Sequence, residues 1–107
     1  RHRLTAVASK QREAKRVGRV LDALRAKGGW WRKLHGSPFT HAGDPDIYGG
    51  YKGRFFQFEV KEPDGSLSAI QKWTIEDINR REAGYALMVR EPEEALAFIE
   101  EVMNERV

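Results

Sequence analysis

Two short segments carry residue types that could hold a divalent cation. The first is Gly43-Asp44-Pro45-Asp46, and the second is Phe58-Glu59-Val60-Lys61. Side chains alternate between the faces of a strand, so Glu59 and Lys61 would point the same way. If the strand that begins in the first segment pairs with the second, Asp46 can lie opposite Glu59. Two carboxylates, a backbone carbonyl and waters would make a magnesium site, with the lysine beside it.

The elements that would position these groups follow from the apolar pattern. Val17, Val20, Leu21 and Leu24 recur at helical spacing before Gly28-Gly29, which predicts a helix over residues 8–27. Ser68 and Gln71 have the pattern of a capping box at the start of a second helix. The remaining pattern predicts strands at 30–35, 45–49, 54–62 and 85–89, the second helix to about residue 82, and a last helix from Pro92. This αβββαβα order predicts an α/β fold with a mixed central sheet flanked by helices.

Glu13 and Gln71 each allow two interpretations. Glu13 stands one helical turn before Val17, on the apolar face, where an unpaired carboxylate would be costly to bury. A metal or a nearby lysine would explain it; alternatively, the helix frays before Glu13 and leaves it in water. Gln71 could serve the capping box or a site near a metal or phosphate. We expect that one side chain would not easily do both.

Composition restricts the possible functions. The chain has 107 residues, enough for one domain with its own core. It has no cysteine, so disulfides and thiolate metal sites are excluded, and it has no apolar run long enough to span a membrane. We therefore expect a soluble, cytoplasmic protein.

Charge is unevenly distributed along the chain. Residues 1–33 hold eleven Lys or Arg and two Asp or Glu, whereas residues 34–107 hold eight and fourteen. A basic leading third could neutralise the phosphates of a nucleic acid, although a merely solvated helix is the alternative. The cations predicted to bind nucleic acid are Lys10, Arg12, Lys15, Arg16, Arg19 and Lys52.

In order and spacing, these residues resemble the VRR-NUC branch of the PD-(D/E)XK nuclease superfamily. The resemblance covers nearly the whole chain, residues 1–107, as a single nuclease domain. It includes the acid of the leading helix, the Gly28-Gly29-Trp30-Trp31 segment, Gly43-x-Pro45-Asp46, Phe58-Glu59-Val60-Lys61, Ser68-x-x-Gln71, a strand after Gly84 and a helix led by Pro92. It implies a restriction-endonuclease-like αβββαβ core with a C-terminal helix.

The resemblance also implies roles for individual residues. Asp46 and Glu59 would bind Mg²⁺ or Mn²⁺, with the Val60 carbonyl as a third ligand and Glu13 completing the site. Lys61 would orient or deprotonate the attacking water, and Gln71 would lie near the metal or the phosphate. Asp44 departs from the pattern and could add a ligand or cap the turn.

The function implied is a metal-dependent endonuclease acting on DNA and selective for structure such as branches or flaps, which includes the resolution of Holliday junctions. Stand-alone relatives look like phage-encoded homodimers, which would act in the host cytoplasm. Two alternatives stay open, namely an inactive nucleic-acid-binding module of the same fold and an RNA-processing nuclease. Trp30 and Trp31 could stack on bases, but neighbours in a strand face opposite ways, so one of them should be core. We assign no catalytic role to His35 or His41.

Overall fold

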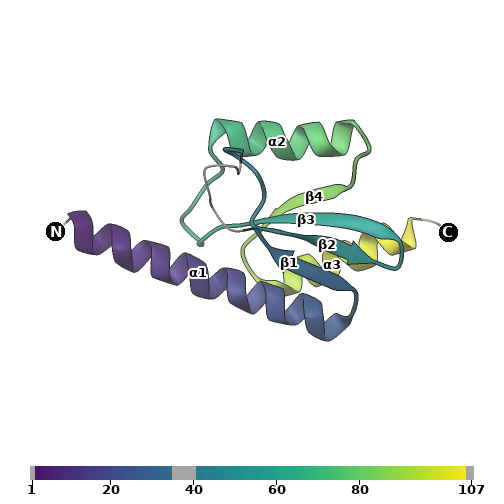
Figure 1. The fold of residues 1–107 in the computed structure, drawn as a ribbon, viewed down its shortest axis with the longest axis horizontal. Coiled ribbons are helices and arrows are strands. Elements are labelled where there is room, and N and C mark those ends of the chain that lie inside the picture. Colours follow the sequence, from purple (N-terminus) through teal and green to yellow (C-terminus); the bar gives the residue numbers. More distant parts are fainter. Residues whose placement is uncertain (1, 35–40, 106–107) are drawn as a thin grey trace.

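The computed structural model describes residues 2–34 and 41–105, with the backbone alone for residues 2–7 and Ser9. Within these ranges, helices and strands follow the predicted order: α1 His2–Lys27, β1 Trp30–Lys33, β2 Ile47–Tyr51, β3 Arg54–Val60, α2 Ala69–Arg80, β4 Tyr85–Val89 and α3 Pro92–Asn104. α1 and α3 lie on one side of the sheet and α2 lies on the other (Figure 1). The predicted α/β class, with a mixed sheet between helices, is confirmed.

The sheet has the strand order β1-β2-β3-β4. The first three strands are antiparallel, with Trp31 opposite Gly49 and Ile47 opposite Phe58. The chain then crosses through α2 and returns as β4, which is parallel to β3. A parallel neighbour requires such a crossover, so the topology itself places α2 against the sheet.

The core lies between the sheet and the helices α1 and α3. Phe56, Phe58 and Val60 are buried on this side, which confirms the predicted alternation along β3. Trp31 is buried with them, whereas Trp30 points to the other side and is 53% exposed. α1 contributes the apolar residues that the sequence predicted, namely Val17, Val20, Leu21 and Leu24, and α3 contributes Ala95, Ile99 and Val102.

The opposite side of the sheet is only partly covered. α2 packs on β4 but has no buried residue, and its Ile70 and Trp73 are exposed. Trp30 of β1 and Phe55 of β3 are also exposed. This side therefore keeps an accessible surface next to α2.

Several predicted boundaries are wrong by a few residues. α1 begins at His2 instead of residue 8, and no acidic residue in its first turn signals that start. β1, β3 and α2 each end two residues before the predicted end. β2 is Ile47–Tyr51 instead of 45–49. Just before its start, the Asp46 carboxylate takes the place of a backbone partner and accepts the Val60 N–H at 2.8 Å.

α1 extends beyond the sheet at its N-terminal end (Figure 1). The overall dimensions are therefore elongated, at 53 × 28 × 25 Å. Among the residues whose burial is described, Val17 is the first buried residue of α1, so the basic turns before it lie outside the core. In the described part of the chain, no helix has both the length and the apolar character needed to cross a bilayer.

Candidate metal centre

Three acidic side chains meet at one end of the sheet. Glu13, Asp46 and Glu59 each offer a carboxylate oxygen, and these oxygens lie within 4.8 Å of one another. They come from α1, from the residue before β2 and from β3. The cluster gathers the three carboxylates that the sequence predicted as metal ligands, with the oxygen donors that hard divalent cations prefer.

The elements explain why these three acids meet. Ile47 is paired with Phe58, so Asp46, one residue earlier, lies across from Glu59. α1 is continuous through Glu13, which is half-buried one turn before the buried Val17. The alternative in which the helix frays before Glu13 is therefore wrong.

Asp46 is held by the backbone on both sides. Its carbonyl accepts the Leu34 N–H at 2.7 Å, and its Oδ2 accepts the Val60 N–H at 2.8 Å. The backbone at Val60 thus faces the Asp46 side chain. The Val60 carbonyl remains a predicted ligand.

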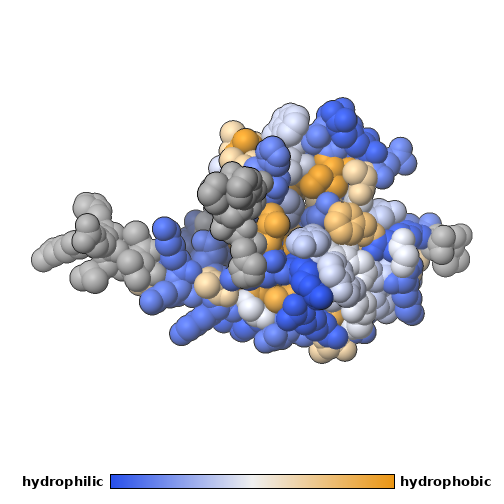
Figure 2. All heavy atoms as spheres, in the orientation of Figure 1, coloured by the Kyte–Doolittle hydropathy of each residue, from blue (hydrophilic) through white to orange (hydrophobic). Residues whose placement is uncertain are grey.

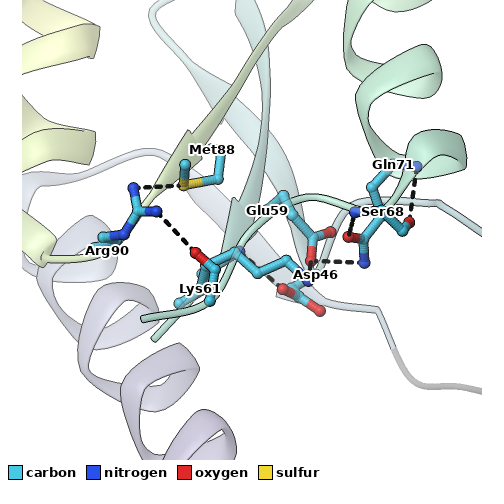
Figure 3. Close-up of polar contacts among 9 residues, drawn as sticks. Asp46, Glu59, Lys61, Ser68, Gln71, Met88 and Arg90 are labelled. Atoms are coloured by element: carbon cyan, nitrogen blue, oxygen red, sulfur yellow. Dashed lines mark hydrogen bonds and ion pairs between the residues drawn. The ribbon is translucent and has the colours of Figure 1, made fainter. Parts of the chain in front are cut away.

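Glu59 is the most confined of the three acids. It is 3% exposed, and its Oε2 lies 3.7 Å from Lys61 Nζ and accepts a hydrogen bond of 3.2 Å from Gln71 Nε2 (Figure 3). Burial, followed by the neighbouring Asp46 carboxylate, raises the pKa of Glu59 to about 8, although Lys61 opposes the shift. A cation at this point would relieve the repulsion between the acids and favour the ionised form of Glu59.

Gln71 performs two tasks with one side chain, contrary to our expectation. Its Oε1 accepts the Ser68 N–H at 2.9 Å, and its backbone N–H donates to Ser68 Oγ at 3.2 Å, which completes the capping box. Its Nε2 is left to donate to Glu59. The two ends of the amide are chemically different, so the cap and the site use different atoms.

Gly43 explains how the loop before β2 reaches α2. Its φ is +89°, and a Cβ placed there would lie 2.9 Å from Ile70 and 3.0 Å from Thr74 Oγ1. Only glycine suits this backbone conformation and this close approach. The contact sets the segment leading to Asp46 against the first turns of α2, which also carry Gln71.

The remaining acids and histidines of this region lie outside the cluster. Asp44 is not one of the three clustered acids, and its backbone N–H donates to the His41 carbonyl at 3.2 Å, which closes the turn. His41 is exposed. His35 lies outside the described residues.

The predicted nucleic-acid-binding cations fall into three groups. Lys10, Arg12, Lys15 and Arg19 are exposed on α1. Arg16 instead forms ion pairs with Glu62 and Glu91, so its charge is engaged within the protein. Lys52 lies in the turn between β2 and β3, at the opposite end of these strands from Asp46 and Glu59.

A hollow of about 500 Å³ adjoins the acidic cluster. Its lining includes Glu13 and Asp46 together with two lysines, Lys10 and Lys33. Lys33 was not among the predicted binding residues. The charge excess of residues 1–33 included it, but only the position at the end of β1 places it beside Asp46.

The chain matches no known protein family, no curated protein and no solved structure. The assignment to the VRR-NUC branch therefore stays a prediction that depends on the residues and on their arrangement.

Proposed function

We propose that this protein is a nuclease, dependent on Mg²⁺ or Mn²⁺, that hydrolyses phosphodiester bonds in DNA. The observation that supports it is the cluster of Glu13, Asp46 and Glu59, with Lys61 and Gln71 both directed at the buried Glu59. Three carboxylates from separate segments repel one another unless a cation or protons intervene. The raised pKa of Glu59 reflects that repulsion as well as burial.

The donor set fits a hard divalent cation. Glu13, Asp46 and Glu59 would hold it through carboxylate oxygens, with the Val60 carbonyl as a further ligand, and magnesium commonly keeps several waters beside one or two carboxylates. When bound, such a cation would supply Lewis-acid stabilisation of charge on the phosphoryl group and lower the pKa of a water. Cysteine is absent from the chain, so a thiolate site for a softer metal is not available.

Side chains around the cluster would orient the reacting groups and bind the phosphate backbone. Lys61 carries an ammonium group next to Glu59, where it can orient a water and stabilise negative charge on a phosphoryl oxygen. Gln71 fixes the orientation of the Glu59 carboxylate through its amide. Lys10 and Lys33 line the adjoining hollow and would attract the phosphate backbone.

The proposal extends to the finer fold and to the substrate. The observed αβββαβ order with α1 and α2 on opposite sides of the sheet supports a restriction-endonuclease-like core followed by a C-terminal helix. Phosphate contacts from α1 would not read sequence, which favours recognition of DNA shape, such as branches or flaps. A two-fold homodimer would bring two centres to such a substrate for paired cuts, as in Holliday junction resolution.

A cleavage assay tests the proposal. Labelled duplex, single-stranded and branched DNA, with RNA in parallel, would be incubated with Mg²⁺, Mn²⁺ or EDTA. We expect cutting only with metal, and we expect Lys61→Ala to lower the rate by about 10²- to 10⁴-fold while DNA binding persists. Asp64→Asn, which changes an exposed acid in the loop after β3, is the matched control and should cut normally.

Two outcomes would contradict the proposal. One is cleavage that persists in both Asp46→Ala and Glu59→Ala, because the carboxylates would then be dispensable. The other is binding of DNA without metal-dependent cutting, which would identify a binding module of this fold. Cutting of RNA in preference to DNA would reassign the substrate.

A further inference from the structure

Two acids of the cluster, Asp46 and Glu59, share one face of the sheet with a group of exposed aromatic residues. Strand register pairs Trp30 with Gly50, and Gly50 with Phe55, so these three residues form a row across β1, β2 and β3. Positions 46, 48 and 50 alternate to the same face, as do 55, 57 and 59. The row therefore lies on the face that carries Asp46 and Glu59, further along the strands.

Gly50 leaves a slot between two aromatic side chains. Trp30 is 53% and Phe55 is 42% exposed, and the glycine between them has no side chain to fill the space. Adjacent strands lie ~4.8 Å apart, so the two aromatic residues are separated by roughly twice that distance. A shallow hollow of about 470 Å³ occupies this place, lined by these three residues and by Lys52 and Arg54. Hydrophobic residues reach the surface between α2 and the strands (Figure 2).

Charge at the slot is positive. Arg32 lies over the Trp30 ring, with its guanidinium carbon 4.2 Å from the ring centroid. The charged groups of Lys52 and Arg54 lie instead over the rings of Tyr51 and Tyr85, which pack against the core, so Arg32 supplies the positive charge at the slot. Within β1, β2 and β3, Glu59 is the only acidic residue, and it belongs to the cluster. The slot thus suits a ligand with flat apolar groups and negative charge.

The slot and the cluster are close enough for one nucleic-acid strand to reach both. Phe55 and Glu59 are four residues apart in β3, which is ~13 Å at the rise of a strand. One strand of a stacked nucleic acid rises about 3.4 Å along its axis per nucleotide, so a few nucleotides span this length.

We propose that the slot formed by Trp30, Gly50 and Phe55 takes an unstacked base of a nucleic-acid strand whose backbone continues to the acidic cluster. The inference rests on the proposed function, and it specifies the substrate as a strand with unpaired bases next to the bond that is cut. Stacking on aromatic rings tolerates any base, so the slot would select unpaired structure and not sequence.

Binding measured in EDTA tests the slot without any cutting. Fluorescence anisotropy would compare labelled oligothymidylate, oligouridylate and a blunt DNA duplex. We expect Trp30→Leu and Phe55→Leu each to weaken single-strand binding by roughly 5- to 150-fold, the loss of one stacked base, with little effect on the duplex. The ratio of the two single-strand affinities tells whether the strand is DNA or RNA.

Matched variants separate stacking from other causes. Leucine keeps the apolar bulk and loses the ring face, whereas Trp30→Phe and Phe55→Tyr keep a ring and should retain most of the affinity. Gly50→Val keeps both rings but fills the slot, and should weaken single-strand binding. Trp73→Leu removes an aromatic residue of 59% exposure on α2 and should change nothing.

Two results would overturn the inference. One is equal loss of duplex and single-strand affinity in the leucine variants. The other is unchanged nucleic-acid affinity together with a shift from dimer to monomer in sedimentation, which would make the face a contact between copies. Failure of the proposed function would give a different result. A protein that does not cut DNA with Mg²⁺ or Mn²⁺ could still bind single strands through the slot.

Discussion

Glu59 combines three properties that a purely structural residue would rarely share. It is 3% exposed, it lies within a group of three carboxylates, and it is contacted by an ammonium and an amide group. Burial and the Asp46 charge disfavour its ionised form, which is why its pKa rises to about 8. Ionising Glu59 in the folded protein is therefore unfavourable, and a bound cation could offset that cost.

At the residue scale, the raised pKa predicts an unusual pH dependence of the free energy of unfolding when no metal is bound. Between the ordinary pKa of 4.5 and the folded value of about 8, folded Glu59 keeps a proton that the unfolded chain loses. Stability in EDTA should therefore fall as pH rises through this window, and level off above it. Glu59→Gln should remove most of the fall and stabilise the protein at pH above 8 by roughly 1 to 4 kcal/mol.

Thermal melts at pH 6 and above pH 8, in EDTA and in Mg²⁺, measure this prediction. Mg²⁺ should raise the melting temperature of the native protein more at the higher pH, because the metal needs the ionised carboxylate. The Mg²⁺ effect should disappear in Glu59→Gln. Glu76→Gln, at an exposed position of α2, should behave like the native protein. A stability that rises with pH in EDTA would contradict the raised pKa.

The sequence predicted which residues form the cluster, but it did not predict the hydrogen bonds that hold them. Alternation along β3 and a pairing with the segment of Asp46 were enough to bring Asp46 and Glu59 together. The bond of Asp46 to the Val60 N–H and the double use of Gln71 depend on positions of single atoms, which a residue pattern does not encode. Lys33 shows the same limit, because its contact with the hollow follows from where β1 ends.

At the scale of elements, α2 depends on its first turn for both its start and its role. The helix buries no residue, so the capping box and the contacts with β4 hold it in place. Gly43 packs against Ile70 and Thr74, which brings the Asp46 loop to the same turn. Helix boundaries inferred from the capping signal were correct at this start, whereas the start of α1, which lacks an acidic first turn, was not.

Two substitutions should separate the cap from the site. Ser68→Ala removes the acceptor of the Gln71 N–H and should lower the free energy of unfolding by about 1 kcal/mol, while metal-dependent cutting persists. Gln71→Glu keeps a residue that suits the capping box but replaces the amide donor with a fourth carboxylate next to the cluster. It should preserve stability more than Ser68→Ala does, and lower cutting more. Denaturant unfolding and cleavage rates measure the two effects, and equal effects of both variants on both quantities would contradict a double role.

At the scale of the whole molecule, the basic residues of the chain are concentrated on the helix that projects beyond the sheet. α1 projects past the sheet (Figure 1). It carries exposed lysines and arginines, of which Lys10 lines the hollow beside Glu13 and Asp46. The count of charged residues along the chain predicted that residues 1–33 would be basic. It did not predict that Arg16 would be engaged by Glu62 and Glu91, since both acids are remote in the chain and meet α1 only in the folded protein.

This arrangement predicts which cations determine the salt dependence of DNA binding. Lys10 and Lys33 line the hollow, so Lys10→Ala and Lys33→Ala should each lower the slope of log affinity against log salt by about 0.7 to 0.9, the value for one lost phosphate contact. Lys72→Ala, at an exposed position of α2, is the control and should leave the slope unchanged. Titrations in EDTA over a range of salt concentrations give these slopes. The prediction would be contradicted if Lys10→Ala and Lys33→Ala left the slope unchanged while Lys72→Ala lowered it. The DNA phosphates would then contact α2, away from the carboxylates.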